Sequence, residues 1–158
     1  MVKVLIKRLN PNVVLPAYKT NGASGMDLMA FIEAPIKIAP NSAYLVPTGL
    51  SMAFSADYEV QIRPRSGLAA KNNITVLNTP GTIDSDYRGE IKIILFNHGN
   101  EDFLINNKDR VAQMILTPVV KMEFEEMDSL PDTLRGEGGF GSTGKWKASW
   151  IKKKLSNI

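Results

Sequence analysis

A carboxylate and an aromatic ring stand close together in segment 74–96, the part of the chain with the clearest potential for chemistry. Asp84 and Tyr87 lie between two apolar, β-branched runs and follow a turn signal at Thr79–Gly81. Proline fixes the backbone at such a turn and glycine supplies its conformational freedom. We expect a short hairpin stem at Thr82–Ile83 that presents the carboxylate and the ring to a ring-bearing ligand. The alternative is a polar surface turn without a ligand.

A basic segment, Arg63–Lys71, carries two arginines, a serine and a glycine at the start of a possible helix over Ser66–Lys71. Backbone N–H groups at a helix start lack partners and suit an anion. Arginine adds bidentate contacts to phosphate oxygens. The segment therefore indicates an anion site, with solvated arginines on a capped helical turn as the alternative.

A glycine-rich segment, Arg135–Gly144, has five glycines in ten residues, which predicts a mobile stretch. Its arginine, phenylalanine, serine and threonine are unusual for an inert linker, because such groups and backbone N–H donors can wrap phosphates. The order Gly-Ser-Thr-Gly-Lys is not a Walker A motif. A flexible linker is the alternative.

Two polar residues stand within apolar stretches, and the second of these stretches reads as a strand. Asp27 lies between Met26 and Leu28, and Gln113 lies within the apolar segment Arg110–Leu116. A buried polar side chain is normally hydrogen-bonded. Gln113 thus either satisfies a core partner or points into a pocket.

Composition excludes several classes of protein. The chain has 158 residues, 44% of them apolar, with no cysteine and a single histidine, His98. This length predicts one domain. The lack of cysteine excludes disulfides and thiolate sites, and a single histidine argues against a histidine-rich metal centre. No apolar run reaches the roughly 20 residues of a membrane helix, so we expect no membrane partner. The start of the chain does not resemble a signal peptide, so we expect a cytoplasmic protein.

The net charge of +3 comes from the end of the chain. Residues 145–158 hold five lysines and no acid, and removing those five charges leaves −2 for residues 1–144. A body of this charge does not suit nucleic acid, so we expect no nucleic-acid partner. Trp146, Trp150 and Leu155 lie near helical spacing, which predicts an amphipathic terminal helix. A membrane-surface or partner-binding helix is the minority interpretation.

Turn signals recur about every 8–12 residues along the first 120 positions, which favours an all-β sandwich or barrel. We expect an edge strand and then a linker within residues 121–134. The domain prediction is a β-barrel over 1–134, a flexible glycine-rich arm over 135–144 and a basic amphipathic tail over 145–158.

Five segments, in this order, resemble the signature segments of the homotrimeric dUTPase family, the deoxyuridine triphosphate nucleotidohydrolases. They are Ala23–Leu28, Pro64–Ala69, Gly81–Ile91, Arg110–Gln113 and Arg135–Gly144. Each motif alone is weak, but five with compatible order and spacing are specific. The tail after Gly144 departs from the family's common pattern.

The resemblance implies a jelly-roll-like distorted β-barrel of short antiparallel strands. It also implies Mg²⁺-dependent hydrolysis of dUTP to dUMP and pyrophosphate, which limits uracil incorporation into DNA and supplies dUMP for thymidylate synthesis. Asp84 would activate the water that attacks the α-phosphorus and accept from the sugar 3′-hydroxyl. Asp27 would hold Mg²⁺ through a water, since Mg²⁺ keeps much of its hydration.

The remaining roles also follow from the resemblance. Tyr87 would stack on the deoxyribose and exclude a 2′-hydroxyl. The uracil contacts, mostly main-chain, would come from Asn78, Gly81, Thr82, Ile83 and Lys92. The phosphate contacts would come from Arg65, Ser66, Gly67 and Gln113. The arm would close as a lid through Arg135, Phe140, Gly141, Ser142 and Thr143.

The family resemblance further implies a homotrimer with three shared sites. Two alternatives remain: a dCTP deaminase-type enzyme on the same fold, and a non-enzymatic nucleotide-binding member. Ammonia release from dCTP would identify the first. The second would keep the fold without needing Asp84 or Arg135.

Overall fold

Antiparallel pairing of short strands accounts for most of the regular structure in the computed structural model, which describes residues 1–139. The predicted arm residues Phe140, Gly141, Ser142 and Thr143 and the predicted tail helix at 145–158 lie outside the described residues. Residues 1–121 form one compact unit, and a second unit begins at Met122. The domain boundaries drawn from the sequence remain predictions.

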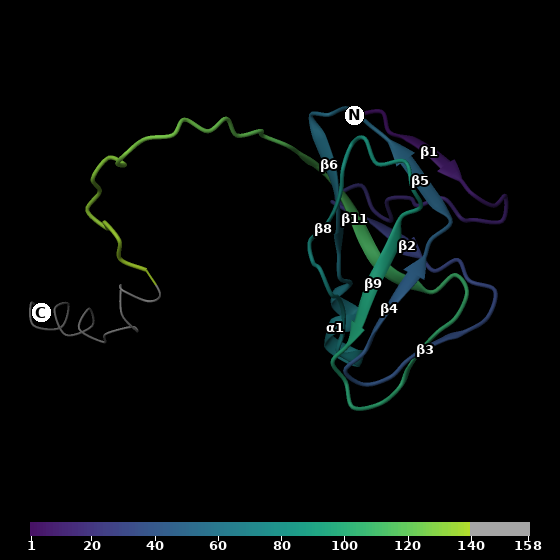
Figure 1. Ribbon diagram of the computed structural model, residues 1–158. Helices are drawn as coiled ribbons and strands as arrows, with labels where there is room; N and C mark the ends of the chain where they lie inside the picture. The colour runs from purple at the N-terminus through teal and green to yellow at the C-terminus, as the bar shows by residue number, and fades with distance from the viewer. Residues whose placement is uncertain (140–158) are drawn as a thin grey trace, which may run out of the picture. The chain divides into compact units, whose positions relative to one another are not determined.

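Within residues 1–121 the chain forms eleven strands and one short helix (Figure 1). The strands are β1 (Leu5–Arg8), β2 (Met26–Met29), β3 (Ile36–Ile38), β4 (Ala43–Pro47), β5 (Leu50–Ala53), β6 (Tyr58–Arg63), β7 (Ile74–Val76), β8 (Gly81–Ile83), β9 (Lys92–Asn97), β10 (Phe103–Ile105) and β11 (Arg110–Pro118). The helix, α1, spans Ser66–Asn72, which confirms the predicted helical turns.

The strands make four separate antiparallel sheets. The largest has the order β2-β11-β6-β8, the next has the order β4-β9-β7, and two ribbons pair β1 with β5 and β3 with β10. None of these sheets closes on itself in the described part of the chain, as expected for a distorted jelly roll. The all-β prediction is confirmed.

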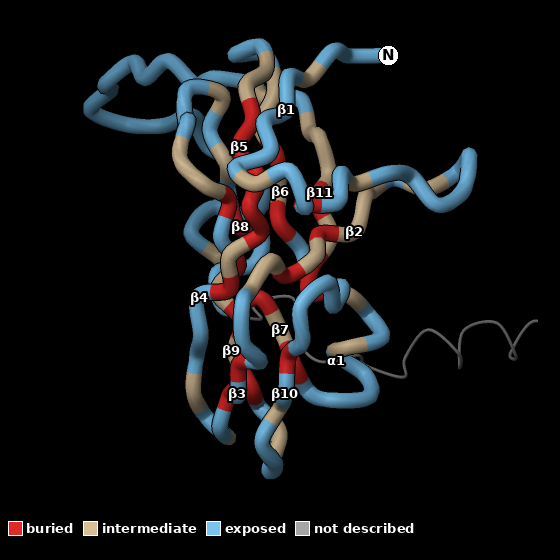
Figure 2. The backbone as a smooth tube through the Cα atoms, turned by 90° about the vertical axis from the view of Figure 1, so that its right-hand side faces the viewer, coloured by how far each residue is buried: buried red, intermediate tan, exposed pale blue. Residues whose placement is uncertain are grey.

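The core lies between the sheets and is built by alternation along the strands. In β9, Ile93 and Leu95 are buried while the side chains between them are more exposed. Figure 2 shows buried segments in red on strands from all four sheets. Since successive side chains of a strand point to opposite faces, this pattern turns one face of β9 toward the core.

Asn97 is the main polar group inside this core, with 1% of its surface exposed. Its Nδ2 donates to the carbonyl oxygens of Ile38 at 2.9 Å and Glu101 at 2.8 Å, and its Oδ1 accepts from the Gly99 N–H at 2.8 Å. The side chain therefore joins β9 to β3 and to the following turn. Within residues 1–139 every buried side-chain nitrogen and oxygen has a hydrogen-bond partner.

Two local predictions need correction. Thr82–Ile83 belongs to a strand, but β8 pairs with β6 rather than with a neighbour in sequence, so the predicted hairpin stem is wrong. The described chain also has no strand within residues 121–134, where an edge strand was expected. Met122 and Phe124 are instead 80% and 86% exposed. A strand needs a partner for its backbone groups, and this segment pairs with no strand within residues 1–139.

No helix within residues 1–139 combines the length and the apolar character needed to cross a membrane.

Replacing Asn97 by alanine should destabilise the fold strongly, because the substitution leaves buried carbonyl groups without their donors. The expected loss is about 3 kcal/mol in the free energy of unfolding, measured by chemical denaturation. Asn100→Ala, at an exposed position of the same turn, should change stability little. Equal stability of the two variants would show that the buried amide does not hold β9 and β3 together.

Candidate active site

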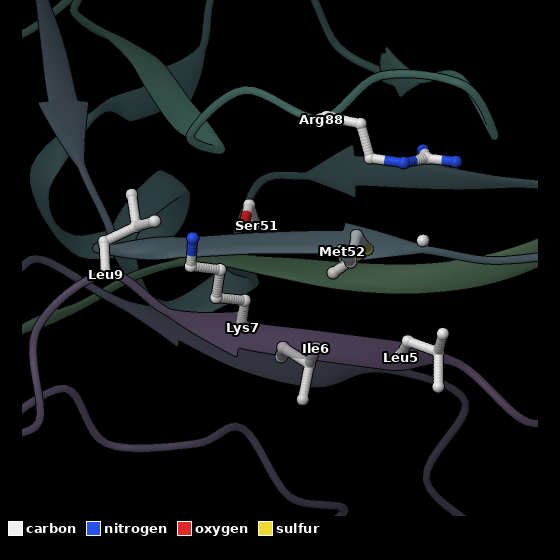
Figure 3. Close-up of a pocket in the computed structure, with 8 residues that line it drawn as sticks. Leu5, Ile6, Lys7, Leu9, Ser51, Met52 and Arg88 are labelled. Atoms are coloured by element: carbon white, nitrogen blue, oxygen red, sulfur yellow. The ribbon is translucent and has the colours of Figure 1, made fainter.

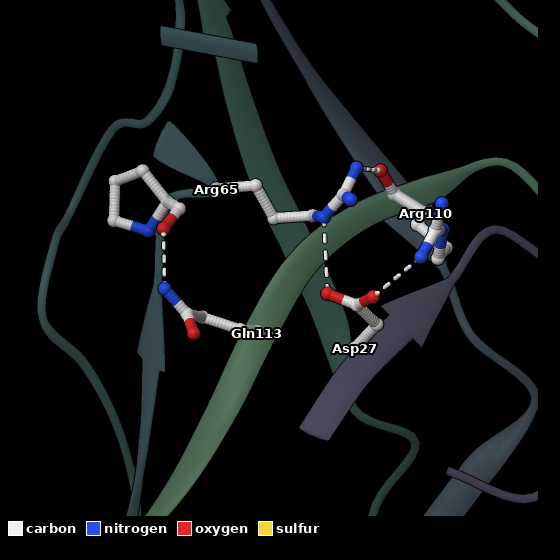
Figure 4. A network of polar contacts seen from close by, with 5 residues as sticks. Asp27, Arg65, Arg110 and Gln113 are labelled. Carbon is white, nitrogen blue, oxygen red and sulfur yellow. Dashed lines mark hydrogen bonds and ion pairs between the residues drawn. The ribbon is translucent and has the colours of Figure 1, made fainter. Parts of the chain in front are cut away.

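One carboxylate lies between two guanidinium groups where β2, β6 and β11 meet (Figure 4). Asp27 Oδ1 is 3.0 Å from Arg65 Nε, and its Oδ2 is 3.1 Å from Arg110 Nη1. Arg65 Nη1 also donates to the backbone oxygen of Arg110 at 2.9 Å. Three segments far apart in sequence thus meet at a single ion-paired cluster.

Strand register explains how these residues come together. Gln113 in β11 lies opposite Asp27 in β2 and opposite Arg63 in β6. The β2–β11 register shifts between Arg110 and Ala112, an irregularity of the kind that re-aims side chains at sites. Arg65 follows β6 directly and is the N-cap residue of α1.

Gln113 satisfies a local partner, the first of the two possibilities predicted for it. Its Nε2 donates to the carbonyl oxygen of Pro64 at 3.0 Å. This bond, drawn as a dashed line from Gln113 in Figure 4, holds the turn that connects β6 to α1. Gln113 therefore orients the segment from which Arg65 extends.

The electrostatics of the cluster favour an anion. Asp27, with its side chain 18% exposed, balances one of the two guanidinium charges. Arg65 uses two of its five N–H donors in the contacts described. Ser66 is exposed beside it, and a Cβ built on Gly67 would meet no atom within 4 Å, so this start of α1 is open to a ligand.

A second polar group follows β8. Asp84 is exposed, and its carbonyl oxygen accepts from the Tyr87 N–H at 3.1 Å. The Tyr87 hydroxyl donates to the carbonyl oxygen of Glu90 at 3.0 Å. Asn78 lies against Gly81, where a Cβ would be 3.2 Å from its Nδ2. The predicted base, its aromatic neighbour and the predicted uracil contacts at Asn78 and 81–83 thus gather in one region.

Asp84 and Arg65 lie toward opposite ends of β6. Ile83, the residue before Asp84, pairs with Val60, whereas Arg65 lies beyond the other end of β6. Five residues of extended chain separate Val60 from Arg65, roughly 15–20 Å. A single chain therefore does not bring Asp84 beside Asp27 and Arg65.

Lys92 and Arg135 are the other predicted site residues that the structure describes. Lys92 opens β9 opposite Pro47, and its ammonium group is 3.7 Å from Glu90. Arg135 belongs to the unit that begins at Met122, where its Nε donates to the Gly138 carbonyl at 2.6 Å.

A separate pocket of about 330 Å³ runs along β1 and β5. Figure 3 shows Leu5 and Ile6 of β1 on one side of it and Arg88 on the other. Its lining is mainly apolar and includes none of the predicted site residues. The pocket is therefore not the polar site described above.

Sequence reasoning missed Arg110 as a site residue. It opens a strand that is mainly apolar, and a charge at the first position of such a strand is a usable signal for a site at the strand end. Its ion pair with Asp27 depends on the β2–β11 register, which the sequence does not reveal.

The described residues hold no group of three or more histidine, aspartate or glutamate side chains that could bind a metal. Asp27 is a lone carboxylate, and each of its oxygens accepts one guanidinium N–H. A carboxylate has about four acceptor positions, so both oxygens can still accept from water.

Comparison with known proteins identifies the family of this chain. The dUTPase family model matches residues 12–144. The deoxyuridine 5′-triphosphate nucleotidohydrolase of Nautilia profundicola is 56% identical over 144 residues, covering 91% of this chain and 100% of the relative. That of Bdellovibrio bacteriovorus is 53% identical over 143 residues, covering 90% and 96%.

Solved structures share the fold. The dUTPase of Staphylococcus bacteriophage 80alpha with dUpNHpp superimposes with a TM-score of 0.77 at 20% identity, covering 90% of this chain and 99% of that one. The dUTPase from phage phi11 of S. aureus gives a TM-score of 0.73 at 17% identity, covering 83% and 99%. Identities this low bear on the fold alone, but the family model and the two close relatives establish that the chain belongs to the dUTPase family.

Proposed function

We propose that the protein hydrolyses dUTP to dUMP and pyrophosphate by attack of water on the α-phosphorus. The observation that carries the proposal is the cluster in which Arg65 and Arg110 hold Asp27, on a chain more than half identical to deoxyuridine 5′-triphosphate nucleotidohydrolases. The activity limits uracil incorporation into DNA and supplies dUMP for thymidylate synthesis.

The phosphate chain binds at the open start of α1. Arg65 is held in place by Asp27 and by the Arg110 backbone, so its guanidinium is oriented before the ligand arrives. Ser66 and Gly67 offer a hydroxyl and backbone N–H groups in a space free of side chains. Gln113 holds the preceding turn through Pro64. Donors fixed in advance cost little reorganisation during the reaction.

The base and sugar bind at β8 and the loop that follows. Backbone groups of Gly81, Thr82 and Ile83 read the uracil edge, with Asn78 packed behind Gly81. Cytosine leaves these groups mismatched, and buried unpaired polar groups are penalised strongly. Lys92 contributes through its backbone, since its ammonium group lies near Glu90. Tyr87 covers the deoxyribose.

Asp84 is the general base. Its carboxylate is exposed at the end of β8, beside the position proposed for the sugar, and can accept a proton from water at the α-phosphorus. Fixing that water in line with the leaving pyrophosphate supplies much of the rate acceleration, because phosphoryl transfer depends mainly on positioning and charge stabilisation.

Magnesium fits this site through water. A dUTPase of phage phi11 of S. aureus coordinates a structural Mg(II) ion. Asp27 is the carboxylate nearest the proposed phosphate site, and its oxygens keep capacity to accept from metal-bound water. When bound, the ion neutralises charge that develops on the phosphate oxygens. The protein's part is to hold Asp27 rigid between two arginines.

The complete site is shared between chains of a homotrimer. The separation of roughly 15–20 Å along β6 keeps Asp84 of one chain from reaching phosphates held by its own Arg65. Val120, Met122 and Phe124 are all more than 79% exposed, and apolar side chains exposed together support burial against another copy. An association of copies would supply the missing half of the site and cover these side chains.

The glycine-rich arm closes over the bound nucleotide. Arg135 meets the γ-phosphate and Phe140 covers the uracil ring, while Gly141, Ser142 and Thr143 wrap the phosphates. Closure of such a segment excludes bulk water and fixes the triphosphate for in-line attack.

Pyrophosphate release with Mg²⁺ tests the function directly, with dUTP, dTTP, dCTP and UTP compared side by side. We expect release from dUTP alone. Absence of release from all four substrates would favour a non-enzymatic binding protein, and ammonia release from dCTP would favour a deaminase.

Asp84→Asn should lower kcat by about 10²–10⁴-fold while changing substrate affinity by less than about tenfold. Asparagine keeps the shape and hydrogen bonds of the side chain but cannot take the proton. Single-turnover kinetics and binding of a non-hydrolysable dUTP analogue measure the two effects. Asp86→Asn is the matched control at an exposed neighbouring carboxylate. A near-normal rate for Asp84→Asn would remove it from the role of base.

Shared sites predict that two inactive variants restore each other. Arg65→Ala and Asp84→Asn should each be inactive alone, whereas a co-expressed equal mixture should recover about a quarter of the wild-type activity if each site takes the two residues from different chains. Sites confined to one chain would leave the mixture inactive, because no chain would carry both residues intact.

A further inference from the structure

We propose that Gly89 is a specificity-determining residue, which favours deoxyribose over ribose by fixing the tilt of the Tyr87 ring. The inference rests on the proposed function, in which that ring covers the sugar of dUTP. In this proposal Gly89 does not contact the ligand and acts only through the Tyr87 ring.

The Tyr87 ring lies directly against Gly89. A Cβ built on Gly89 would be 2.3 Å from the Tyr87 hydroxyl oxygen and 2.5 Å from its Cζ. Real Cβ atoms do not approach other heavy atoms so closely. Any side chain at position 89 must therefore push the ring out of its present place.

Glycine is needed at position 89 because the Tyr87 ring occupies the space of a side chain, not because the backbone there is unusual. Among the described glycines, positive φ angles occur at Gly49 and Gly136, not at Gly89. The backbone at position 89 is thus open to an ordinary L-residue. Its missing side chain has a local explanation, which is the room that the tyrosine ring occupies.

Several hydrogen bonds set the ring within its loop. The Tyr87 hydroxyl donates to the Glu90 carbonyl at 3.0 Å, and its N–H donates to the Asp84 carbonyl at 3.1 Å. Arg88 Nη1 donates to the carbonyl oxygens of Ser85 at 2.7 Å and Tyr87 at 3.0 Å. Tyr87 is nonetheless 44% exposed, so the ring keeps a surface that a sugar can cover.

The base of the loop is anchored to the core. The Glu90 carboxylate accepts from the Gly49 N–H at 2.8 Å. The next residue, Ile91, is fully buried, and its N–H donates to the Leu50 carbonyl at 2.8 Å. Glu90, whose carbonyl holds the Tyr87 hydroxyl, therefore cannot follow a displaced ring. A side chain at position 89 would move the ring rather than the whole loop.

A displaced ring has a specific chemical consequence. Discrimination against UTP depends on the ring filling the space that a 2′-hydroxyl would need. A methyl group at position 89 lifts the ring and opens that space, while the β8 backbone that reads the uracil edge keeps its pairing with β6. A side chain at position 89 should therefore lower the selectivity for deoxyribose over ribose and leave the selectivity for uracil over cytosine unchanged.

The test compares kcat/KM of wild type and Gly89→Ala for dUTP, UTP and dCTP. We expect the dUTP-to-UTP ratio to fall by about tenfold or more, and the dUTP-to-dCTP ratio to stay within about twofold. Gly22→Ala is the matched control, since a Cβ there would meet no atom within 4 Å and its φ is not positive. This control should leave both ratios unchanged.

A Gly89→Ala protein that folds with an unchanged dUTP-to-UTP ratio would overturn the inference, as would equal losses in both selectivities. Failure of wild type to hydrolyse dUTP would instead refute the proposed function, and the inference with it. If Gly89→Ala does not fold, Tyr87→Phe tests the ring's tilt by removing its bond to Glu90. The dUTP-to-UTP ratio should then fall, and an unchanged ratio would count against control by tilt.

Discussion

Pairing of β11 on both of its edges is the constraint on which the rest of the structure depends. Gln113 lies opposite Asp27 on one side and opposite Arg63 on the other. A slip of one residue in either register would reverse which side chains face the core. The buried residues Val111, Ala112 and Met114 oppose such a slip. Burial of β11 and placement of the polar cluster are therefore set by the same register.

The cluster around Asp27 balances opposing demands. An anion site needs converging positive charges, yet two guanidinium groups held together repel each other in the free protein. The carboxylate between them relieves this repulsion and fixes the geometry of both. Because the three side chains are partly exposed, we assign the arrangement to orientation rather than to a large gain in stability.

Sequence reasoning recovered features that depend on local patterns. Short alternating runs gave the all-β class, and the start of α1 at Ser66 followed from its flanking residues. The pairing of β8 with β6 could not be read, because it joins segments about twenty residues apart with no turn signal specific to it. The distance between Asp84 and Arg65 and the ion pair of Arg110 depend on such pairings. The candidate site was thus predicted as a set of residues, without the separation of Asp84 from Arg65 along β6.

The placement of Asp84 and Arg65 toward opposite ends of one strand has a genetic consequence. Under shared sites, each chain gives its Arg65 to one site and its Asp84 to another, so a chain with one damaged residue disables only one site. A chain with both residues damaged disables two sites of a mixed assembly. A doubly defective copy expressed beside a normal one would therefore remove more activity than its share of the chains, whereas with self-contained sites the loss would match that share.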